Sequence, residues 1–254
     1  MVHFFVFKTS LTMNKALLFF CLLYAQSSIA QFNDSTNHHF SFSTSGVINK
    51  TKETSSYVLN TGASYGISKK KISQNTSATW IYGKQQDKLS NNDVSVNADL
   101  DYLRDVRKLY YWALANFDES YSLKINYRFQ AGAGIGYNLI KEKDLNLILS
   151  DGFLYETSDL TDPVLGKDIY QTIRSSFRIK YHWQLKDILV LEGSHFIQPS
   201  LLSLKDYIIK SNSTLTLKLN KWLGINTSFT FNKISRTNRQ NLLFTYGLAV
   251  DKYF

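Results

Sequence analysis

A strict alternation of apolar and polar residues runs through residues 123–137, LKINYRFQAGAGIGY. Its odd-numbered positions are all apolar and its even-numbered positions are polar or glycine, so the two faces of an extended strand would differ sharply. Soluble strands usually end after about five or six residues, whereas a tilted strand needs roughly 9–11 residues to cross a bilayer. The segment therefore predicts one strand of a transmembrane β-barrel, with its apolar face towards lipid and its polar face towards the lumen.

The same period of two recurs elsewhere, most clearly at residues 57–68, 93–102, 172–184 and 223–232. Polar turn residues separate these segments, which predicts an all-β fold. We expect an antiparallel transmembrane β-barrel of about twelve strands, an even number as in single-chain bacterial barrels. The expected strands span residues 39–49, 56–68, 76–85, 93–103, 108–117, 122–138, 144–155, 169–184, 187–197, 207–219, 222–233 and 241–254.

The expected connections between strands alternate in length over the second half of the chain. Those at residues 140–143, 185–186 and 220–221 are short, and those at residues 156–168, 198–206 and 234–240 are longer. Short periplasmic turns that alternate with longer outer loops are typical of outer-membrane barrels, so the alternation favours the same topology. The turn at residues 68–75 is longer than this alternation predicts.

Residues 1–30 have the composition of a cleavable signal peptide rather than of a folded element. From Met13, an alternative start of the chain, Lys15 provides a positive charge, an apolar core follows, and residues 28–30 provide a small-residue cleavage site. No later segment has the ~20 apolar residues that a transmembrane helix needs. We therefore expect residues 31–254 to form the barrel and to cross the membrane as strands.

The net charge and the cysteine content limit the partners and the metal or disulfide sites that the mature chain can have. The formal net charge is +9, and it falls by two, to +7, when Lys8 and Lys15 leave with the signal peptide. A basic exported protein meets anionic lipid head groups first, so we expect outer-membrane lipids rather than nucleic acid as its surroundings. The single cysteine, Cys21, also leaves with the signal peptide, so the mature chain can form neither a disulfide nor a thiolate metal site. No cofactor is expected.

The last expected strand ends in an aromatic residue, Phe254, and carries Tyr246 on its apolar face. A terminal aromatic residue on an amphipathic final strand resembles the signal that is read by the outer-membrane barrel-assembly machinery. We therefore expect Phe254 and Tyr246 to act as an assembly signal and that machinery to be a partner during biogenesis. Together with the signal peptide, this predicts the outer membrane of a Gram-negative bacterium as the location.

Three features together resemble the salt-induced outer-membrane protein family, whose barrel domain has no assigned function. They are the strand at residues 123–137, the strand with Arg174, and the terminal Phe254. The resemblance implies an outer-membrane barrel and no established activity. The first expected strand fits less well, because Val47 stands where a polar residue would be expected.

Two sets of charged residues are expected on the inner wall. The basic set is Lys124, Arg128, Arg174, Arg178, Lys180 and His182, and the acidic set is Asp93, Asp99, Asp101 and Glu192. One interpretation is a charged constriction that selects small solutes. The interpretation that we favour is pairing of these charges across a narrow lumen filled by side chains. Removal of Arg178 would then leave a buried carboxylate unpaired, at a cost of roughly 3–5 kcal/mol.

Gly132, Gly134 and Gly136 could suggest a phosphate-binding loop. Such a loop needs a turn from a strand into a helix, whereas here the alternation runs straight through the glycines. We expect instead that these inward-facing glycines permit strand coiling or make room for bulky neighbours.

A serine and a histidine are adjacent at Ser194 and His195, but neighbouring strand residues point to opposite faces and cannot form a nucleophile–base pair. His195 could instead meet Ser211 or Ser213 from the next strand, on the lipid-facing side. That pair lacks an acid or amide to orient the histidine, so we expect no enzyme.

The sequence therefore predicts an outer-membrane barrel with an envelope structural or stress-related role and a narrow or plugged polar lumen. A small-solute channel is the alternative. A lipid-facing hydrolase is the least favoured reading.

Overall fold

The computed structural model describes residues 37–51, 54–69, 71–104, 106–162 and 166–253. The helices and strands assigned in this part of the chain are all β-strands, and no helix in it is long and apolar enough to cross a membrane. The predicted signal peptide at residues 1–30 and the terminal Phe254 lie outside the described residues, so both stay predictions.

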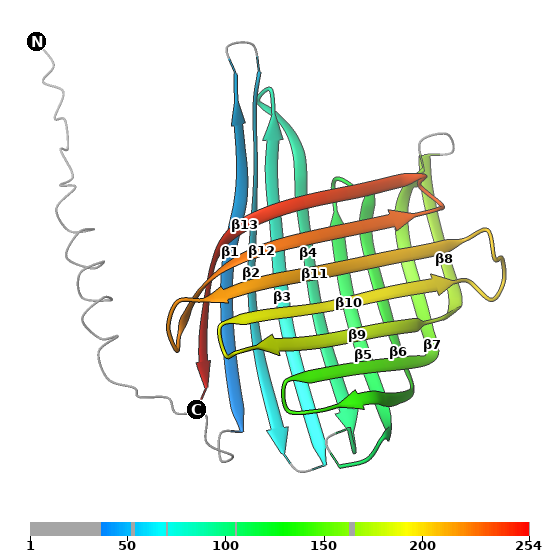
Figure 1. Cartoon of the computed structure of the whole chain (residues 1–254). Coiled ribbons are helices and arrows are strands. Elements are labelled where there is room, and N and C mark those ends of the chain that lie inside the picture. The colour runs from blue at the N-terminus through cyan, green and yellow to red at the C-terminus, as the bar shows by residue number, and fades with distance from the viewer. Residues whose placement is uncertain (1–36, 52–53, 70, 105, 163–165, 254) are drawn as a thin grey trace, which may run out of the picture. The chain divides into compact units, whose positions relative to one another are not determined.

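Thirteen strands form one antiparallel sheet (Figure 1). They are β1 (His38–Lys50), β2 (Ser55–Lys69), β3 (Ile72–Gln85), β4 (Lys88–Tyr102), β5 (Leu109–Ser120), β6 (Ile125–Lys141), β7 (Leu145–Asp162), β8 (Gly166–Ser175), β9 (Phe177–Leu185), β10 (Leu189–Pro199), β11 (Tyr207–Lys218), β12 (Leu223–Ile234) and β13 (Arg239–Tyr253). Because β1 pairs with β13 and β6 pairs with β7, the sheet closes into a barrel. β8 and β9 pair with successive parts of β7 and are separated only at Ser176, so they count as one of twelve barrel strands.

The predicted all-β class, antiparallel barrel and number of strands are confirmed, but the predicted alternation of connection lengths is wrong. β7 continues to Asp162 and β8 begins at Gly166, so most of the expected loop at residues 156–168 is strand. The expected long turn at residues 68–75 is also short, since β2 ends at Lys69 and β3 begins at Ile72. Beyond the apolar band both faces of a strand are polar, so the period of two disappears there although the backbone ladder continues.

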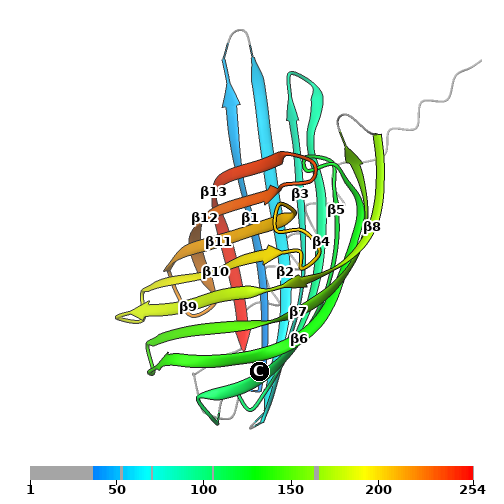
Figure 2. The ribbon, with the colours of Figure 1, turned by 90° about the vertical axis from the view of Figure 1, so that its right-hand side faces the viewer.

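The outer face of the barrel is apolar and the inner face is polar, as the alternation predicts. Phe129 and Phe177 are each 40% exposed, whereas their neighbours Gln130 and Arg178 are 1% and 2% exposed. Figure 1 and Figure 2 show β1–β4 rising steeply along one wall while β9–β12 cross the facing wall at a large angle. Strands of a closed barrel tilt against its axis, so opposite walls cross in this way.

The beginning of β6 departs from the predicted alternation. The pairing of β6 with β7 shifts register between Ile125 and Tyr127, and this irregularity reverses the facing of the residues before it. Leu123 and Ile125 are therefore buried instead of facing lipid. Lys124 lies before β6 in a turn, with φ of 59° and its ammonium 4.3 Å from the ring centroid of Tyr121. Its predicted place on the inner wall of the strand is wrong.

Aromatic side chains fill the interior beside the glycines of β6. Tyr110 and Trp112 on β5 are 1% and 3% exposed. A Cβ atom built on Gly136 would lie 2.2 Å from Cζ of Tyr110, and one built on Gly134 would lie 2.6 Å from a ring carbon of Trp112. The expectation that these glycines make room for bulky neighbours is confirmed.

The barrel has two ends, which we call the terminal end and the opposite end. At the terminal end, β1 begins and β13 ends, and the connections at residues 142–144 and 186–188 lie there. The opposite end carries the connections at residues 121–124, 200–206 and 235–238. The polar side chains of the interior are distributed unequally between these ends.

Candidate functional site

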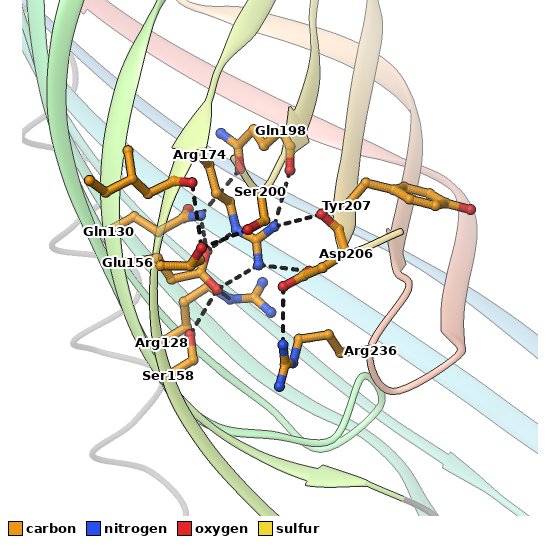
Figure 3. A network of polar contacts seen from close by, with 12 residues as sticks. Arg128, Gln130, Glu156, Ser158, Arg174, Gln198, Ser200, Asp206, Tyr207 and Arg236 are labelled. Carbon is orange, nitrogen blue, oxygen red and sulfur yellow. Dashed lines mark hydrogen bonds and ion pairs between the residues drawn. The ribbon is translucent and has the colours of Figure 1, made fainter. Parts of the chain in front are cut away.

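Arg174 on β8 is fully buried, at 0% exposure, and links three parts of the barrel interior (Figure 3). Its Nε and Nη2 atoms donate to the two carboxylate oxygens of Glu156 on β7, at 2.7 and 3.1 Å. Nη1 donates to the backbone carbonyls of Gln198 on β10 and Asp206, each at 3.2 Å, and Nη2 donates to the Asp206 carboxylate at 2.9 Å. One guanidinium thus joins β7, β10 and the connection at residues 200–206.

Glu156 is also fully buried, and further donors surround it. The register places Gln130 on β6 directly opposite it, and Gln130 Nε2 donates to Glu156 Oε2 at 2.6 Å. Ser158 Oγ donates to Oε1 at 3.1 Å, and the Tyr170 hydroxyl donates to the same oxygen. Arg128 lies farther away, with Nε 3.7 Å from Oε1. A buried carboxylate is tolerated only with this degree of compensation. We call these residues, with Asp206, the Arg174 network.

Arg236 extends the Arg174 network into the connection at residues 235–238. Its guanidinium donates to both carboxylate oxygens of Asp168, at 2.8 and 2.9 Å, and to Asp206 at 3.2 Å. It also lies over the ring of Tyr170, 3.8 Å from the centroid. The hydrogen bonds to Asp168 hold the pKa of Arg236 above its ordinary value. These contacts tie two connections of the opposite end to each other and to β8.

An apolar layer accompanies these polar contacts at the opposite end. Leu123 lies in the connection between β5 and β6, and Ile125 is the first residue of β6. Both pack with Leu160 of β7 and with Ile234, the last residue of β12. Leu160 is 0% exposed and Ile234 is 1% exposed. The interior is therefore filled by packed side chains at this level.

Two ion pairs cross the middle of the barrel. Arg178 on β9 donates from Nη1 to Asp99 on β4 at 3.0 Å, and Lys210 on β11 donates to Asp118 on β5 at 2.7 Å. Both pairs join strands that are far apart around the wall. Arg178 is buried, and its guanidinium carbon lies 5.2 Å from the ring centroid of Trp112. The predicted meeting of Arg178 with an aspartate across the lumen is therefore observed.

Other predicted inner-wall residues have different partners. Asp101 pairs with Arg104 at 2.6 Å rather than with Arg178. Lys180 Nζ lies 3.8 Å from Asp99, which it shares with Arg178. His182 lies 3.6 Å from Glu192, and both side chains are exposed.

Asp93 is held by neutral donors. Its carboxylate accepts hydrogen bonds from the hydroxyls of Ser120 and Ser122, at 2.7 Å each, and from the amide of Asn91 at 3.2 Å. The predicted acidic set is therefore divided among separate contacts and does not form one constriction.

Sequence reasoning missed Glu156, Asp206 and Arg236, because all three fall in segments that were predicted as loops. For Glu156 a signal existed. Together with Ser158 it continues the inward phase of β7, which Ser150 also shares. Asp206 and Arg236 lie in connections, where no periodic signal applies.

A cavity of about 420 Å³ lies near the terminal end. Its lining residues are Arg104, Asn138, Lys141, Asn146, Ile148, Lys180, Tyr181, His182, Glu192, Gly193, Ser194, Asn212 and Thr214. The interior is thus filled towards the opposite end and hollow towards the terminal end. We call this space the terminal-end cavity.

A polar cluster lies on the outer face of β9–β11. His195 Nδ1 is 2.6 Å from Ser211 Oγ, and the Tyr181 hydroxyl is 2.9 Å from Ser213 Oγ. The rings of Tyr181 and His195 are stacked, with centroids 5.5 Å apart. No acidic or amide side chain among the described residues is hydrogen-bonded to His195, so the ring lacks the orienting group of a catalytic triad.

The described part of the chain contains no group of three or more His, Cys, Asp or Glu side chains that could hold a metal ion.

A closed antiparallel barrel with an apolar outer face and a polar interior is the architecture of outer-membrane β-barrel proteins. The structure is similar to that of the NanC porin, with a TM-score of 0.53 and 9% sequence identity over 84% of this chain and 99% of that one. It is also similar to an outer-membrane channel from Pseudomonas putida F1, with a TM-score of 0.48 and 11% identity over 88% of this chain and 97% of that one. For the KdgM porin the TM-score is 0.46, with 11% identity over 85% of this chain and 99% of that one.

By sequence, the chain belongs to the DUF481 family of proteins of unknown function, whose family model matches residues 44–250. No curated protein sequence matches the chain. The match supports one part of the predicted resemblance, namely that the chain belongs to a barrel family without an assigned function. The name of the salt-induced family is not confirmed. The NanC porin shares the fold at 9% identity, so the similarity does not assign a substrate.

Proposed function

We propose that this protein is an outer-membrane barrel of a Gram-negative bacterium with a plugged lumen and an envelope structural or stress-related role. The Arg174 network is the observation that carries this proposal. Arg174 and Glu156 are both 0% exposed although each is charged, which requires that water be excluded around them. An open aqueous pore would leave such side chains hydrated.

The number of strands is compatible with either a filled or an open interior. Barrels of about eight strands are filled by side chains, and barrels of about sixteen leave a channel. In this twelve-stranded barrel, long side chains support the filled interior. The apolar layer around Leu160 and the crossing pairs of Arg178 and Lys210 obstruct the path at successive levels.

Conductance in planar lipid bilayers tests the proposal. We expect the wild-type barrel to give little or no stepwise current at moderate voltage. The double variant Glu156→Gln with Arg174→Ala removes the central ion pair and the long arginine side chain, so it should conduct more than the wild type. Stable stepwise currents through the wild-type barrel, like those of open porins, would contradict a plugged lumen.

A small-solute channel is the second candidate, and the terminal-end cavity favours it. A cavity of about 420 Å³ already occupies the terminal-end part of the interior, so a channel would need a continuation through the side chains of the opposite end. A channel of this kind should give wild-type currents that depend on voltage or on added solute. The same bilayer recordings therefore separate the two candidates.

We further infer that the barrel is not an enzyme and that its main partners are outer-membrane lipids. His195 Nδ1 and Ser211 Oγ are 2.6 Å apart, which is within the range for a base and a nucleophile. Among the described residues, no acidic side chain is hydrogen-bonded to His195 to orient it. Phospholipid turnover by the purified protein should therefore equal that of a Ser211→Ala variant. Turnover that disappears in this variant would establish a lipid hydrolase.

A further inference from the structure

We propose that the terminal-end cavity binds a small carboxylate or phosphate anion, with Lys180 as the main contact. This inference goes beyond the plugged-barrel function and does not depend on it, because the cavity lies near the terminal end and no residue of the Arg174 network lines it. It rests on the charged residues that line the cavity, on a lining hydroxyl without a hydrogen-bond partner, and on the volume of the cavity.

The charged lining of the cavity is mainly cationic. Arg104, Lys141 and Lys180 line it, whereas Glu192 is its single acidic lining residue. Glu192 lies 3.6 Å from His182 and is 56% exposed at its side chain, so its charge is partly compensated and hydrated. The resulting potential favours an anion over a cation.

Lys180 shares its nearest carboxylate with a second cation. One oxygen of Asp99 serves both Arg178, at 3.0 Å, and Lys180, at 3.8 Å. The neighbouring Asp101 is occupied by Arg104 at 2.6 Å. Lys180 is therefore only loosely paired, and its ammonium can donate to a ligand in the cavity.

One polar atom of the cavity wall lacks a partner, which independently indicates a missing ligand. Ser194 Oγ, which belongs to a lining residue of the cavity, is buried and has no hydrogen-bond partner among the described residues. A buried unsatisfied donor costs free energy, so an oxygen-rich ligand that accepts from this hydroxyl would remove the cost.

The size and neutral lining of the cavity limit the ligand class. Small-molecule sites usually have volumes of about 300–1,000 Å³, and this cavity lies at the small end of that range with about 420 Å³. Asn146, Asn212 and Thr214 add neutral polar groups to its wall. These properties fit a small organic acid or a phosphate and leave no room for a long polymer.

Equilibrium binding measured by titration calorimetry tests the proposal on the full-length barrel in detergent micelles, with citrate and inorganic phosphate as probes at constant ionic strength. We expect saturable binding of at least one probe to the wild type. Lys180→Gln should weaken that binding about tenfold, because a charge-assisted hydrogen bond is lost. Glu192→Gln should strengthen it, because a repelling carboxylate is removed.

Lys88→Gln is the matched control, since it removes one exposed lysine at the start of β4, away from the cavity. It should leave binding unchanged, and heat-modifiable gel mobility should show that every variant is folded. Absence of saturable wild-type binding, or equal affinities of Lys180→Gln and Lys88→Gln, would overturn the site. A gain of affinity in Glu192→Gln cannot arise from misfolding. Bilayer conductance does not enter this experiment, so its outcome is separate from that of the plugged-barrel proposal.

Discussion

Truncation of Arg174 tests how far the buried network stabilises the barrel. Arg174→Ala removes the bidentate partner of Glu156, whose side chain is 0% exposed. The carboxylate keeps hydrogen bonds from Gln130 and Ser158, and Arg128 stays 3.7 Å away. Removing one partner of a buried ion pair costs about 3–5 kcal/mol. Because these other partners stay in place, we expect a loss near the lower limit, about 3 kcal/mol in the free energy of unfolding.

Arg178→Ala is the matched comparison, since it removes the same residue type from the same wall. Its partner Asp99 has a side chain that is 24% exposed, and Lys180 lies 3.8 Å away as a second cation. Water and Lys180 can replace the lost guanidinium at Asp99. The main losses are therefore the hydrogen bond from Arg178 Nε to Ser150 Oγ, at 2.9 Å, and the contact with the Trp112 ring. We expect a cost of about 1–2 kcal/mol. This corrects the larger cost expected from sequence, which assumed a fully buried carboxylate.

Urea-induced unfolding in phospholipid vesicles measures both variants, with tryptophan fluorescence and the heat-modifiable gel band as readouts. Adding Glu156→Gln to Arg174→Ala removes the stranded carboxylate charge and should recover part of the lost stability. The recovery should be incomplete, because buried Arg128, 3.7 Å from Glu156, loses its carboxylate neighbour. Equal losses for the two arginine variants, or no recovery in the double variant, would refute the assigned role of the Arg174 network.

Two further predictions test the faces and the packing of the wall. Phe129→Arg on the outer face should cost about 2–4 kcal/mol of unfolding free energy, whereas Thr79→Arg on the exposed inner face of β3 should cost much less. Equal costs in vesicle unfolding would contradict the register. Gly136→Ala should cost about 1–3 kcal/mol, because the new methyl group would overlap the Tyr110 ring. Gly62→Ala should cost nothing in the same assay, since its nearest neighbour would lie 3.4 Å away, and equal losses would disprove the packing argument.

The number and facing of the strands could be predicted from sequence because they depend on local pattern. A lipid-facing position must be apolar, so the alternation of Phe129 with Gln130 identifies both faces without knowledge of any neighbour. The start of β6 could not be predicted in the same way. Leu123 and Ile125 are apolar in either facing, so their sequence does not distinguish lipid contact from packing inside the barrel.

The partners within the interior could not be predicted because they depend on contacts between distant parts of the chain. The pattern indicated that Arg174 points inward, but Asp206 and Arg236 reach it from connections that carry no period of two. Arg178 and Asp99 were correctly expected to meet because both lie on inner faces of well-defined strands. Prediction was therefore good within the strands and poor at the opposite end.

The unequal distribution of side-chain size around the wall explains how a twelve-stranded barrel can be closed without a separate plug domain. On β1 and β2 the inward pairs are small, as in Ser41 with Ser64 and Ser43 with Gly62. The long interior side chains, such as that of Arg174, come mainly from β5–β9 and extend into the space that the small residues leave. These long side chains take no part in the hydrogen bonds between strands, and those hydrogen bonds alone hold the sheet as a barrel. Their removal should therefore widen a path along β1 and β2 while the strands stay paired, which is why the double variant is expected to conduct ions rather than to unfold.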